Sequence, residues 1–279
     1  MSNKVLTFTT DFGSSDSYVA AMKGVALGIA PDLTLVDVTH DVPSHDIVHG
    51  AFVLGSVYRY FPAHTVHVAV VDPGVGTSRK AVTLVTPFGS FCAPDNGLLS
   101  YVLNDHHAKD RTSFESKEFG TPVRVPVPDG CEAFEISNPA YRLEPVSDTF
   151  HGRDIFTPAG THLASGLKPE RLGKPLNDLT ILNLFTLELS KDCVVGKVIH
   201  VDRFGNVVTN IPASQLPQGD VVVEIADTKI HGLSTTFADA EGLLALIGSH
   251  GYLEIAENLG SAARRLDIGV GDTVVAHVR

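Results

Sequence analysis

The stretch Val66–Arg79, VHVAVVDPGVGTSR, decides how we interpret the fold. An apolar run from Val66 to Val71 ends on the carboxylate of Asp72, passes through a turn rich in proline and glycine, and reaches Arg79 seven residues later. A buried strand that stops on an acidic residue at such a turn places that residue at the edge of a sheet. Open α/β proteins build their sites at this edge, so the pattern predicts a site at Asp72.

Strand-like and helix-like runs alternate through the first half of the chain. The patterns predict strands over 5–9, 33–38, 66–71, 81–86 and 91–93, and helices over 18–29, 45–60, 98–104 and 155–165. Such alternation is typical of a mainly parallel sheet flanked by helices. The polar segment 106–130, which contains several prolines, interrupts the pattern, and we interpret it as a surface excursion.

The last third of the chain has a different character. Short β-type runs separated by Gly, Pro, Asn and Asp turns occur at 194–201, 207–210, 221–225, 243–247, 252–255 and 273–278. This spacing is typical of a small all-β barrel or sandwich. We therefore predict an α/β domain over 1–175, a linker over 176–192, and an all-β, barrel-like domain over 193–279.

The composition argues against several classes of protein. Of the 279 residues 43% are hydrophobic and 19% charged, and the formal net charge is −11. Nucleic acids and anionic membranes require clustered Lys and Arg, so we expect neither as a partner. The chain shows neither an apolar stretch of membrane-spanning length nor a signal peptide ahead of the first strand. We expect a soluble, cytoplasmic protein.

The cysteines and histidines match no template for a metal site. Cys92, Cys131 and Cys193 are scattered and form no CxxC pair. His45 and His49 are four residues apart but lack a third ligand in sequence, and the HExxH motif is absent. We expect no bound metal.

Two acidic residues follow the first strand. Asp11 is placed to accept hydrogen bonds from a ribose diol, as acidic residues do in nucleotide-binding folds. The alternative is that Asp11 or Asp16 caps the helix that begins near Tyr18, and for Asp16 we favour the cap.

Asp72, Arg79 and His151 also allow two interpretations. Asp72 and Arg79 fit a structural ion pair that braces their turn, and His151 by itself fits a hydrogen-bonded structural histidine. Together, however, a carboxylate, a guanidinium and an imidazole can hold and polarise a water molecule.

The second domain contains two polar segments of interest. In Asp202–Asn206, DRFGN, the Asn206 amide suits the edge of an adenine and Phe204 could stack on the base. The alternative is a β-turn with an Asx motif. The segment Ser249–Glu254, SHGYLE, could clasp a small zwitterion.

Seven motifs together resemble a known family. In chain order they are DFGSSDSYVAAMKG, VVDPGVGTSRK, APDNGLL, NPAYRL, TFHGRDIFTPA, DRFGNVVTNI and GSHGYLEIAEN. They are similar to the S-adenosyl-L-methionine (SAM) hydrolases that form adenosine, also called SAM hydroxide adenosyltransferases, in the superfamily of the fluorinase and chlorinase. The likeness spans nearly the whole chain.

The resemblance implies that SAM and water react to give adenosine and L-methionine, by attack of activated water at C5′. SAM is then the substrate, and no cofactor is expected. The resemblance also implies a homotrimer, in which each active site lies between the N-terminal domain of one subunit and the C-terminal domain of its neighbour.

The resemblance assigns roles to individual residues. Asp72, Arg79 and His151 match the residues that activate water in the family, and Asp11 matches the carboxylate that binds the ribose hydroxyls. The methionine portion is assigned to Asp16, Asp202, Ser249 and Glu254, the adenine to Asn206, and the region near the ring to Phe204 and Phe237.

Departures from the halogenases bear on the reaction. Asp72 replaces their tyrosine near C5′, Gly152 replaces the serine at the halide site of the fluorinase, and the long loop after the Asp72–Arg79 region is missing. A carboxylate beside the attacking position would repel a halide. Two alternatives remain: a SAM-dependent, chlorinase-like halogenase, and a non-catalytic sensor of SAM or adenosine.

Overall fold

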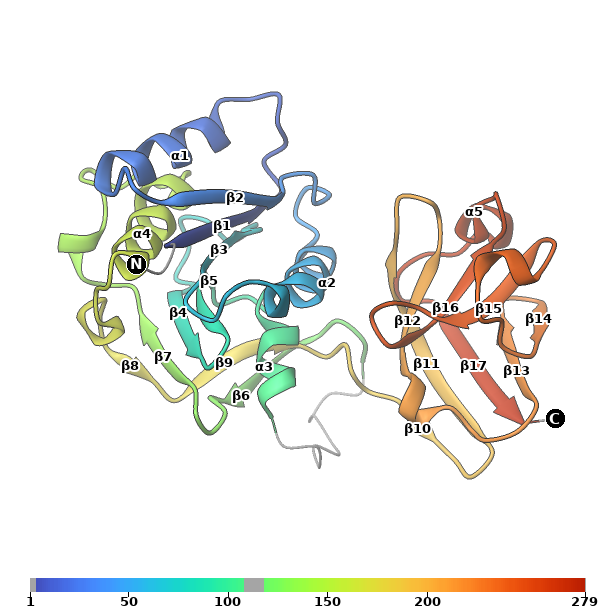
Figure 1. Ribbon diagram of the computed structural model, residues 1–279. Helices are drawn as coiled ribbons and strands as arrows, with labels where there is room; N and C mark the ends of the chain where they lie inside the picture. The colour runs from blue at the N-terminus through green and yellow to red at the C-terminus, as the bar shows by residue number, and fades with distance from the viewer. Residues whose placement is uncertain (1–3, 108–117, 279) are drawn as a thin grey trace. The chain divides into compact units, whose positions relative to one another are not determined.

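The computed structural model describes residues 4–107 and 118–278, which divide into two compact units. The N-terminal unit comprises the described residues 4–107 and 122–182, and the C-terminal unit comprises 118–121 and 183–278. Each unit packs around its own cluster of buried apolar side chains. Figure 1 labels the elements of both.

A seven-stranded mixed sheet forms the centre of the N-terminal unit, in the order β2-β1-β3-β5-β4-β7-β8. Its strands are β1 (Val5–Thr10), β2 (Thr34–Thr39), β3 (Val66–Val70), β4 (Ala81–Thr86), β5 (Gly89–Pro94), β7 (Glu132–Glu135) and β8 (Pro175–Leu176). The first four strands in the order pair in parallel, and the other pairings are antiparallel. The predicted α/β class is confirmed. The sheet is mixed because β4 and β5 are joined by a short hairpin, which allows only antiparallel pairing.

Helices cover both faces of this sheet (Figure 1). The α-helices are α1 (Tyr18–Ile29), α2 (Ile47–Val57), α3 (Ser100–His106) and α4 (Thr157–Ala164). Shorter turns are η1 (Tyr58–Tyr60), η2 (Pro139–Tyr141), η3 (Gly152–Phe156) and η4 (Pro169–Arg171). All six residues of β1 are buried, as expected for a strand covered on both faces.

Part of the predicted surface excursion is a strand. Residues 108–117 lie outside the described residues, but β6 (Pro122–Pro126) pairs antiparallel with β9 (Asp178–Leu182). Prolines are tolerated at the ends of such an edge strand. The local sequence pattern of 122–126 therefore does not predict this strand, whose partner lies more than fifty residues away.

Strands β1 and β3 bring two predicted site segments to the same edge of the sheet. The strands are parallel neighbours, and Thr10 pairs with Val70 at their carboxyl ends. Asp11 follows one strand and Asp72 follows the other after the buried Val71. This is the edge at which open α/β proteins bind ligands.

The C-terminal unit is a nearly closed, barrel-like antiparallel sheet. The strand order is β14-β13-β17-β11-β12-β16-β15, and β10 pairs with β11. The strands are β10 (Glu188–Leu189), β11 (Cys193–Val201), β12 (Val207–Pro212), β13 (Val221–Ile225), β14 (Thr228–His231), β15 (Leu243–Ile247), β16 (Tyr252–Glu257) and β17 (Thr273–Val278). A bridge from Ser234 to Leu246 links the chain after β14 with β15, which confirms the barrel-like prediction. The helical elements are α5 (Ala262–Leu266), η5 (Ala213–Gln215) and η6 (Phe237–Asp239).

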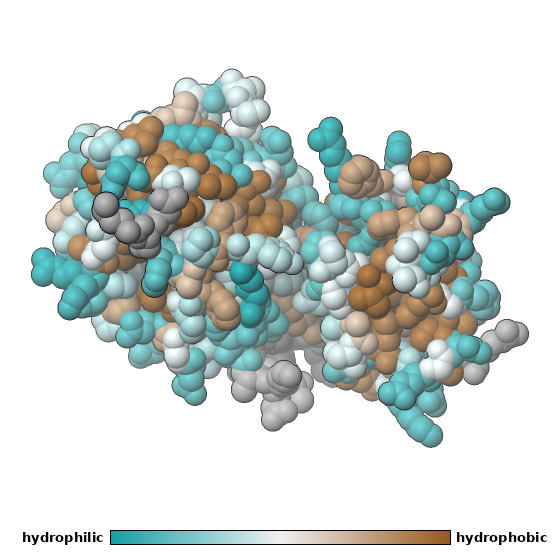
Figure 2. Space-filling view, viewed as in Figure 1, coloured by the Kyte–Doolittle hydropathy of each residue, from teal (hydrophilic) through white to brown (hydrophobic). Residues whose placement is uncertain are grey.

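Apolar residues reach the surface of both units, as Figure 2 shows. Tyr18, Phe204 and Phe237 are among the large apolar side chains that are exposed. None of the helices in 4–107 or 118–278 is long and apolar enough to cross a membrane.

Candidate active site

Asp72, Arg79 and His151 meet at the carboxyl end of β3. Arg79 Nε donates a hydrogen bond of 2.9 Å to Asp72 Oδ1. Arg79 Nη2 donates both to Asp72 Oδ2 and, over 2.6 Å, to His151 Nδ1. The side chains of Arg79 and Asp72 are only 11% and 4% exposed, so water screens this pair much less than a surface pair. The structure thus brings together three residues that are distant in the sequence.

An asparagine and a glycine hold the turn after β3 in place. Asn96 Nδ2 donates a hydrogen bond of 2.8 Å to the carbonyl oxygen of Val71. Gly76 has a φ of +77°, and a Cβ at this position would lie 2.6 Å from the carbonyl oxygen of Asp148. Only glycine tolerates this conformation and close approach together. The turn can therefore pack against the loop that precedes His151.

His151 lies at the start of η3, a π-helical turn that leads into α4. The buried Asp154 in this turn accepts hydrogen bonds from Ser147 N, at 2.8 Å, and from the guanidinium of Arg153. These contacts tie the loop before His151 to the turn that follows it. Single π-helical turns are rare and occur frequently at functional sites.

The contact with Arg79 defines the protonation of His151. Arginine has donors but no acceptor, so Nδ1 of His151 must be unprotonated to accept from Arg79. The neutral imidazole then carries its proton on Nε2. Burial, reinforced by the positive charge of Arg79, lowers the pKa of His151 and favours this neutral form. His151 consequently presents an N–H donor away from Arg79.

Asp11 and Asp16 differ in their surroundings. Asp11 is partly buried, and its Oδ2 accepts a hydrogen bond of 2.9 Å from the backbone N–H of His45. Asp16 is exposed. The prediction that Asp16 caps the first helix is wrong, because the N-cap residue is Ser17 and no side chain caps that helix.

Gly152 packs beneath an aromatic cluster that the sequence analysis did not identify. A Cβ at Gly152 would lie 3.0 Å from Cε2 of Phe12, so a larger residue would press on that ring. The rings of Phe12, Tyr18 and Phe150 contact one another with centroids 5.1–5.8 Å apart. The sequence contains one signal for this cluster, because Phe12 and Phe150 directly adjoin the predicted site residues Asp11 and His151.

Asp202 and Asn206 form a compact turn before β12. Asp202 Oδ1 accepts hydrogen bonds of 2.9 Å from the backbone N–H groups of Phe204 and Asn206, and its Oδ2 accepts one from Asn206 Nδ2. This is the Asx-type turn that we gave as the alternative. The ring of Phe204 remains 74% exposed.

Glu254 lies on β16 with 5% of its surface exposed. Burial, together with the negative charge of Asp202, raises the pKa of Glu254 to about 6. A Cβ at Gly248 would collide with Oε2 of Glu254, so the glycine leaves room for this carboxyl group. The ion pairs in the described part of the C-terminal unit use other carboxylates, those of Glu224 and Glu257.

Ser249 and Phe237 are exposed, Ser249 in the turn before β16 and Phe237 at the start of η6. The predicted residues of the C-terminal unit thus lie on two turns, on strand β16 and at the start of η6. Within the two described ranges, no three His, Cys, Asp or Glu side chains are arranged to hold a metal ion.

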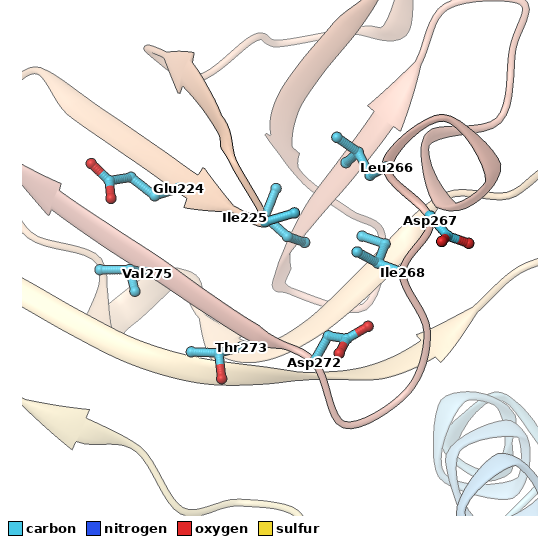
Figure 3. Close-up of a pocket in the computed structure, with 9 residues that line it drawn as sticks. Glu224, Ile225, Leu266, Asp267, Ile268, Asp272, Thr273 and Val275 are labelled. Atoms are coloured by element: carbon cyan, nitrogen blue, oxygen red, sulfur yellow. The ribbon is translucent and has the colours of Figure 1, made fainter.

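A cavity of about 450 Å³ in the C-terminal unit contains none of the predicted residues. Figure 3 shows the carboxylates of Glu224, Asp267 and Asp272 around the apolar side chains that line it. Glu224 is already paired with Lys229 and His277, at 2.5 and 3.0 Å. The charge of this cavity is therefore partly neutralised by the protein itself.

Known proteins resemble both units. The family model of the SAM hydroxide adenosyltransferase N-terminal domain matches residues 6–173, and that of the C-terminal domain matches residues 196–275. A protein of Salinispora arenicola named (R)-S-adenosyl-L-methionine hydrolase is 35% identical over 270 residues, which are 96% of this chain and 95% of that protein. A fluorinase of Nocardia brasiliensis is 28% identical over 315 residues, covering 98% of this chain and 97% of its own.

A crystal structure of an uncharacterized conserved protein from Thermotoga maritima has the same fold. The TM-score is 0.83 at 34% sequence identity, and the match covers 98% of this chain and 100% of the other. Taken with the two domain models, which together span both units, these matches show that the chain belongs to the SAM hydroxide adenosyltransferase family.

Proposed function

We propose that this protein hydrolyses (R)-S-adenosyl-L-methionine to adenosine and L-methionine by direct attack of water at C5′. The observation that carries the proposal is the Asp72–Arg79–His151 group, whose members are hydrogen-bonded to one another through Arg79 at the carboxyl end of β3, with Asp72 and Arg79 largely buried. Family membership supports the choice of substrate, and the name of the Salinispora arenicola relative supports the (R) epimer at sulfur.

The chemistry needs a nucleophile in line with the bond that breaks. The water oxygen forms a bond to C5′, the C5′–S bond breaks with its electron pair moving to sulfur, and the water loses a proton. Methionine leaves as a neutral thioether, so the reaction requires no general acid and, in our proposal, no cofactor. In-line positioning can supply about 7–11 kcal/mol of the barrier reduction.

The hydrogen bonds of the three side chains suggest separate roles. The Nε2–H group of His151 would donate to the water oxygen and orient it. Asp72 uses one lone pair of each oxygen on Arg79 and retains others, so it would accept the proton of the water. Arg79 would hold both partners, and its charge would stabilise the developing hydroxide. This pattern favours Asp72 over His151 as the group that receives the proton.

The remaining residues would bind the three parts of the substrate. We assign the ribose hydroxyls to Asp11, and the position beside the attacking water to Gly152. The methionine portion is assigned to Asp16, Asp202, Ser249 and Glu254, and the adenine to Asn206, Phe204 and Phe237. The exposed rings of Phe204 and Phe237 fit this role, because base–aromatic stacking contributes about 1–3 kcal/mol per base.

The proposal is tested by incubating the purified protein with SAM in ¹⁸O-labelled water. Chromatography should show adenosine and methionine in equal amounts, and mass spectrometry should find the heavy oxygen in the 5′-hydroxyl group. Absence of adenosine would refute the proposal. With added chloride or fluoride, 5′-halo-adenosine in place of adenosine would instead identify a halogenase, and tight SAM binding without any product would identify a sensor.

The active site is further proposed to form between the N-terminal domain of one subunit and the C-terminal domain of its neighbour in a homotrimer. Mixing Asp72→Asn with Asn206→Ala subunits, after reversible dissociation, would then rebuild some sites from two unaltered domains. An equal mixture should restore about a quarter of the sites, because the subunits combine at random in a cyclic oligomer. Mixtures that stay as inactive as the separate variants would argue against shared sites.

A further inference from the structure

A chain of polar side chains lies behind Asp11. Thr10 Oγ1 is 2.7 Å from His40 Nδ1, and His40 Nε2 is 3.0 Å from Asp37 Oδ1. Lys23 Nζ donates a hydrogen bond of 2.5 Å to the other oxygen of Asp37. Thr10 is fully buried and His40 is 9% exposed. These contacts lead from the carboxyl end of β1 to β2 and α1, starting at the buried Thr10 and ending at Asp37 and Lys23, which are partly exposed.

His40 and Thr10 fix the backbone on both sides of Asp11. The hydroxyl of Thr10, which precedes Asp11, also accepts a hydrogen bond of 3.3 Å from the N–H of Phe12. The N–H of Gly13 donates to the carbonyl oxygen of His40 at 2.8 Å. Thr10 therefore contacts the side chain of His40, whereas Gly13 is bonded to the His40 backbone.

The loop that begins at His40 also contacts the Asp11 side chain. Val42 N donates to the carbonyl oxygen of Thr10 over 3.4 Å, and His45 N donates to Asp11 Oδ2 over 2.9 Å. His45 has a φ of 69°, a left-handed conformation that is uncommon for a residue with a side chain. Such conformations persist where the surrounding contacts impose them, and they cluster at functional sites.

The hydrogen bonds are consistent with one tautomer of His40. If the hydroxyl of Thr10 accepts from Phe12 N, it can donate its own hydrogen to an unprotonated Nδ1. The ring proton then lies on Nε2, which is 3.0 Å from Asp37 Oδ1 but is not aligned to form a hydrogen bond with it.

We propose that His40, through the contact of its side chain with Thr10, is a positioning residue that sets the Asp11 carboxylate to bind the two ribose hydroxyls. The inference deepens the proposed function and depends on its assignment of Asp11 to the ribose. A carboxylate that accepts from two adjacent hydroxyls must be held within about 0.5 Å of the productive geometry. The contact of the His40 side chain with Thr10, the bond from Gly13 N to the His40 backbone and the bond from His45 N to Asp11 supply that restraint.

The test measures recognition of the diol and not overall activity. Calorimetry gives the Kd of adenosine and of 2′,3′-dideoxyadenosine for the full chain, and their ratio isolates the contribution of the hydroxyls. We expect the wild type to prefer adenosine by about tenfold or more, because hydrogen bonds to a charged carboxylate are strong. A structural role alone would weaken the binding of both nucleosides equally and leave the ratio unchanged.

Paired substitutions separate the contact with Thr10 from general effects. His40→Gln places its amide toward Asp37 and loses the Thr10 contact, whereas His40→Asn keeps a polar atom where Nδ1 stands. We expect the ratio to fall to within about threefold of unity in His40→Gln and to recover most of its value in His40→Asn. Thr10→Val should reproduce the loss, and Thr10→Ser should restore the preference.

The control is His162→Gln, which removes another partly buried histidine of the same unit. His162 lies on α4 against Tyr141 and takes no part in the Asp11 contacts. It should keep the wild-type ratio, and thermal melting should show that every variant used is folded. If His40→Gln destabilises the fold, the Thr10→Val and Thr10→Ser pair decides the question.

The outcomes are distinguishable from failure of the proposed function. An unchanged ratio in folded His40→Gln or Thr10→Val would overturn the positioning role while leaving SAM hydrolysis intact. A wild-type protein that hydrolyses SAM but shows no preference for the diol would overturn the ribose assignment and this inference with it. A wild-type protein that neither hydrolyses SAM nor binds adenosine would overturn the proposed function itself.

Discussion

Asp72 in the N-terminal unit and Glu254 in the C-terminal unit lie in opposite electrostatic environments. In the N-terminal unit, Asp72 is matched by Arg79, which also contacts His151, so the group is electrostatically complete. In the C-terminal unit, Glu254 is buried near the like charge of Asp202, and its pKa rises to about 6. The first arrangement therefore balances the charge of its acid within the protein. Among the residues that the structure describes, no ion pair involves Glu254.

The proposed substrate suits this difference, because SAM carries an α-ammonium group and a sulfonium. Keeping a buried carboxylate without its cation destabilises the free protein, and binding the cationic ligand would relieve that cost. Sites of this kind trade stability for function. The comparison predicts that disrupting the Asp72–Arg79–His151 group lowers turnover. Neutralising Glu254 should instead weaken ligand binding and raise the stability of the free protein.

Asp72→Asn should have the largest effect. It removes the proposed proton acceptor and leaves the guanidinium of Arg79 without its charge partner. We expect kcat to fall by about 10²–10⁴-fold, the usual contribution of a positioned acid or base, while the Kd of SAM changes only a few-fold. Rates of adenosine formation and calorimetric titration measure the two quantities separately. A near-normal kcat would contradict the role of Asp72.

The contributions of His67 and Glu254 to the unfolding free energy should change with pH in opposite directions, and the change for His67 should be the larger. This histidine is fully buried between Thr7 and the stacked ring of Phe91, and desolvation lowers its pKa to about 4. In the unfolded chain the pKa of this histidine is about 6.5, so the folded state loses stability as the pH falls from 6.5 toward 4. The loss should approach about 3 kcal/mol.

The measurement for His67 is the difference in unfolding free energy between wild type and His67→Phe as a function of pH. The variant retains an aromatic ring against Phe91 but cannot be protonated. Subtracting the two curves cancels the titration of the shared carboxylates. A difference that stays flat between pH 6.5 and 4 would show that His67 does not retain its neutral form in the folded protein.

Glu254→Gln should stabilise the protein at neutral pH. The pKa of Glu254 is raised from 4.5 to about 6, so the folded state holds the proton more tightly than the unfolded chain. The wild type should therefore gain stability as the pH falls from 6 to 4.5, and above pH 6 the substitution should add about 2 kcal/mol. Chemical denaturation at pH 5 and pH 7.5 measures both effects.

The same substitution should weaken SAM binding, which distinguishes a ligand site from a structural defect. In the wild type, affinity for SAM should decline below pH 6 as Glu254 becomes neutral, and this decline should be absent in Glu254→Gln. The matched control is Glu257→Gln on the same strand, because Glu257 already pairs with Arg265 at 2.6 Å. A stabilised Glu254→Gln protein with unchanged SAM affinity would remove Glu254 from the substrate site.

Regular elements could be predicted from the sequence because their signals are local. The first helix, Tyr18–Ile29, and strands such as Ala81–Thr86 begin and end where their patterns do. Strand β6 was missed because its prolines suggest a loop, and only pairing with β9 makes it a strand. The π-helical turn after His151 was missed for a related reason: the sequence pattern was that of an ordinary helix starting at Ile155.

Individual site residues could be predicted from their motifs, but most of their contacts could not. The approach of the Asp72–Arg79 turn to His151 depends on Gly76 packing against Asp148, a contact over more than seventy residues that leaves no periodic signal. His45 was noted only as a histidine without a metal template, and His40 was not singled out. Their connection to Asp11 is visible once the loop after β2 is folded against the end of β1.

The smallest expected effects come from one helix cap in each unit. Asp46 caps α2 by accepting from His49 N at 2.9 Å, and Ser261 caps α5 by accepting from Arg264 N at 3.3 Å. Replacing either with alanine should lower the unfolding free energy by about 1 kcal/mol or less, with the shorter bond of Asp46 giving the larger loss. Denaturant titration of the two variants measures the difference.

A larger loss in Ser261→Ala than in Asp46→Ala would point to a second role for Ser261, next to the turn that contains Asp202. Gly205, in the turn that contains Asp202, approaches so closely that any Cβ there would collide with Oγ of Ser261. Ala263 N also donates a hydrogen bond of 3.0 Å to the carbonyl oxygen of Gly205. A larger loss in Ser261→Ala, accompanied by weaker SAM binding, would show that this helix supports the Asp202 turn, whereas loss of stability alone would confine Ser261 to the cap.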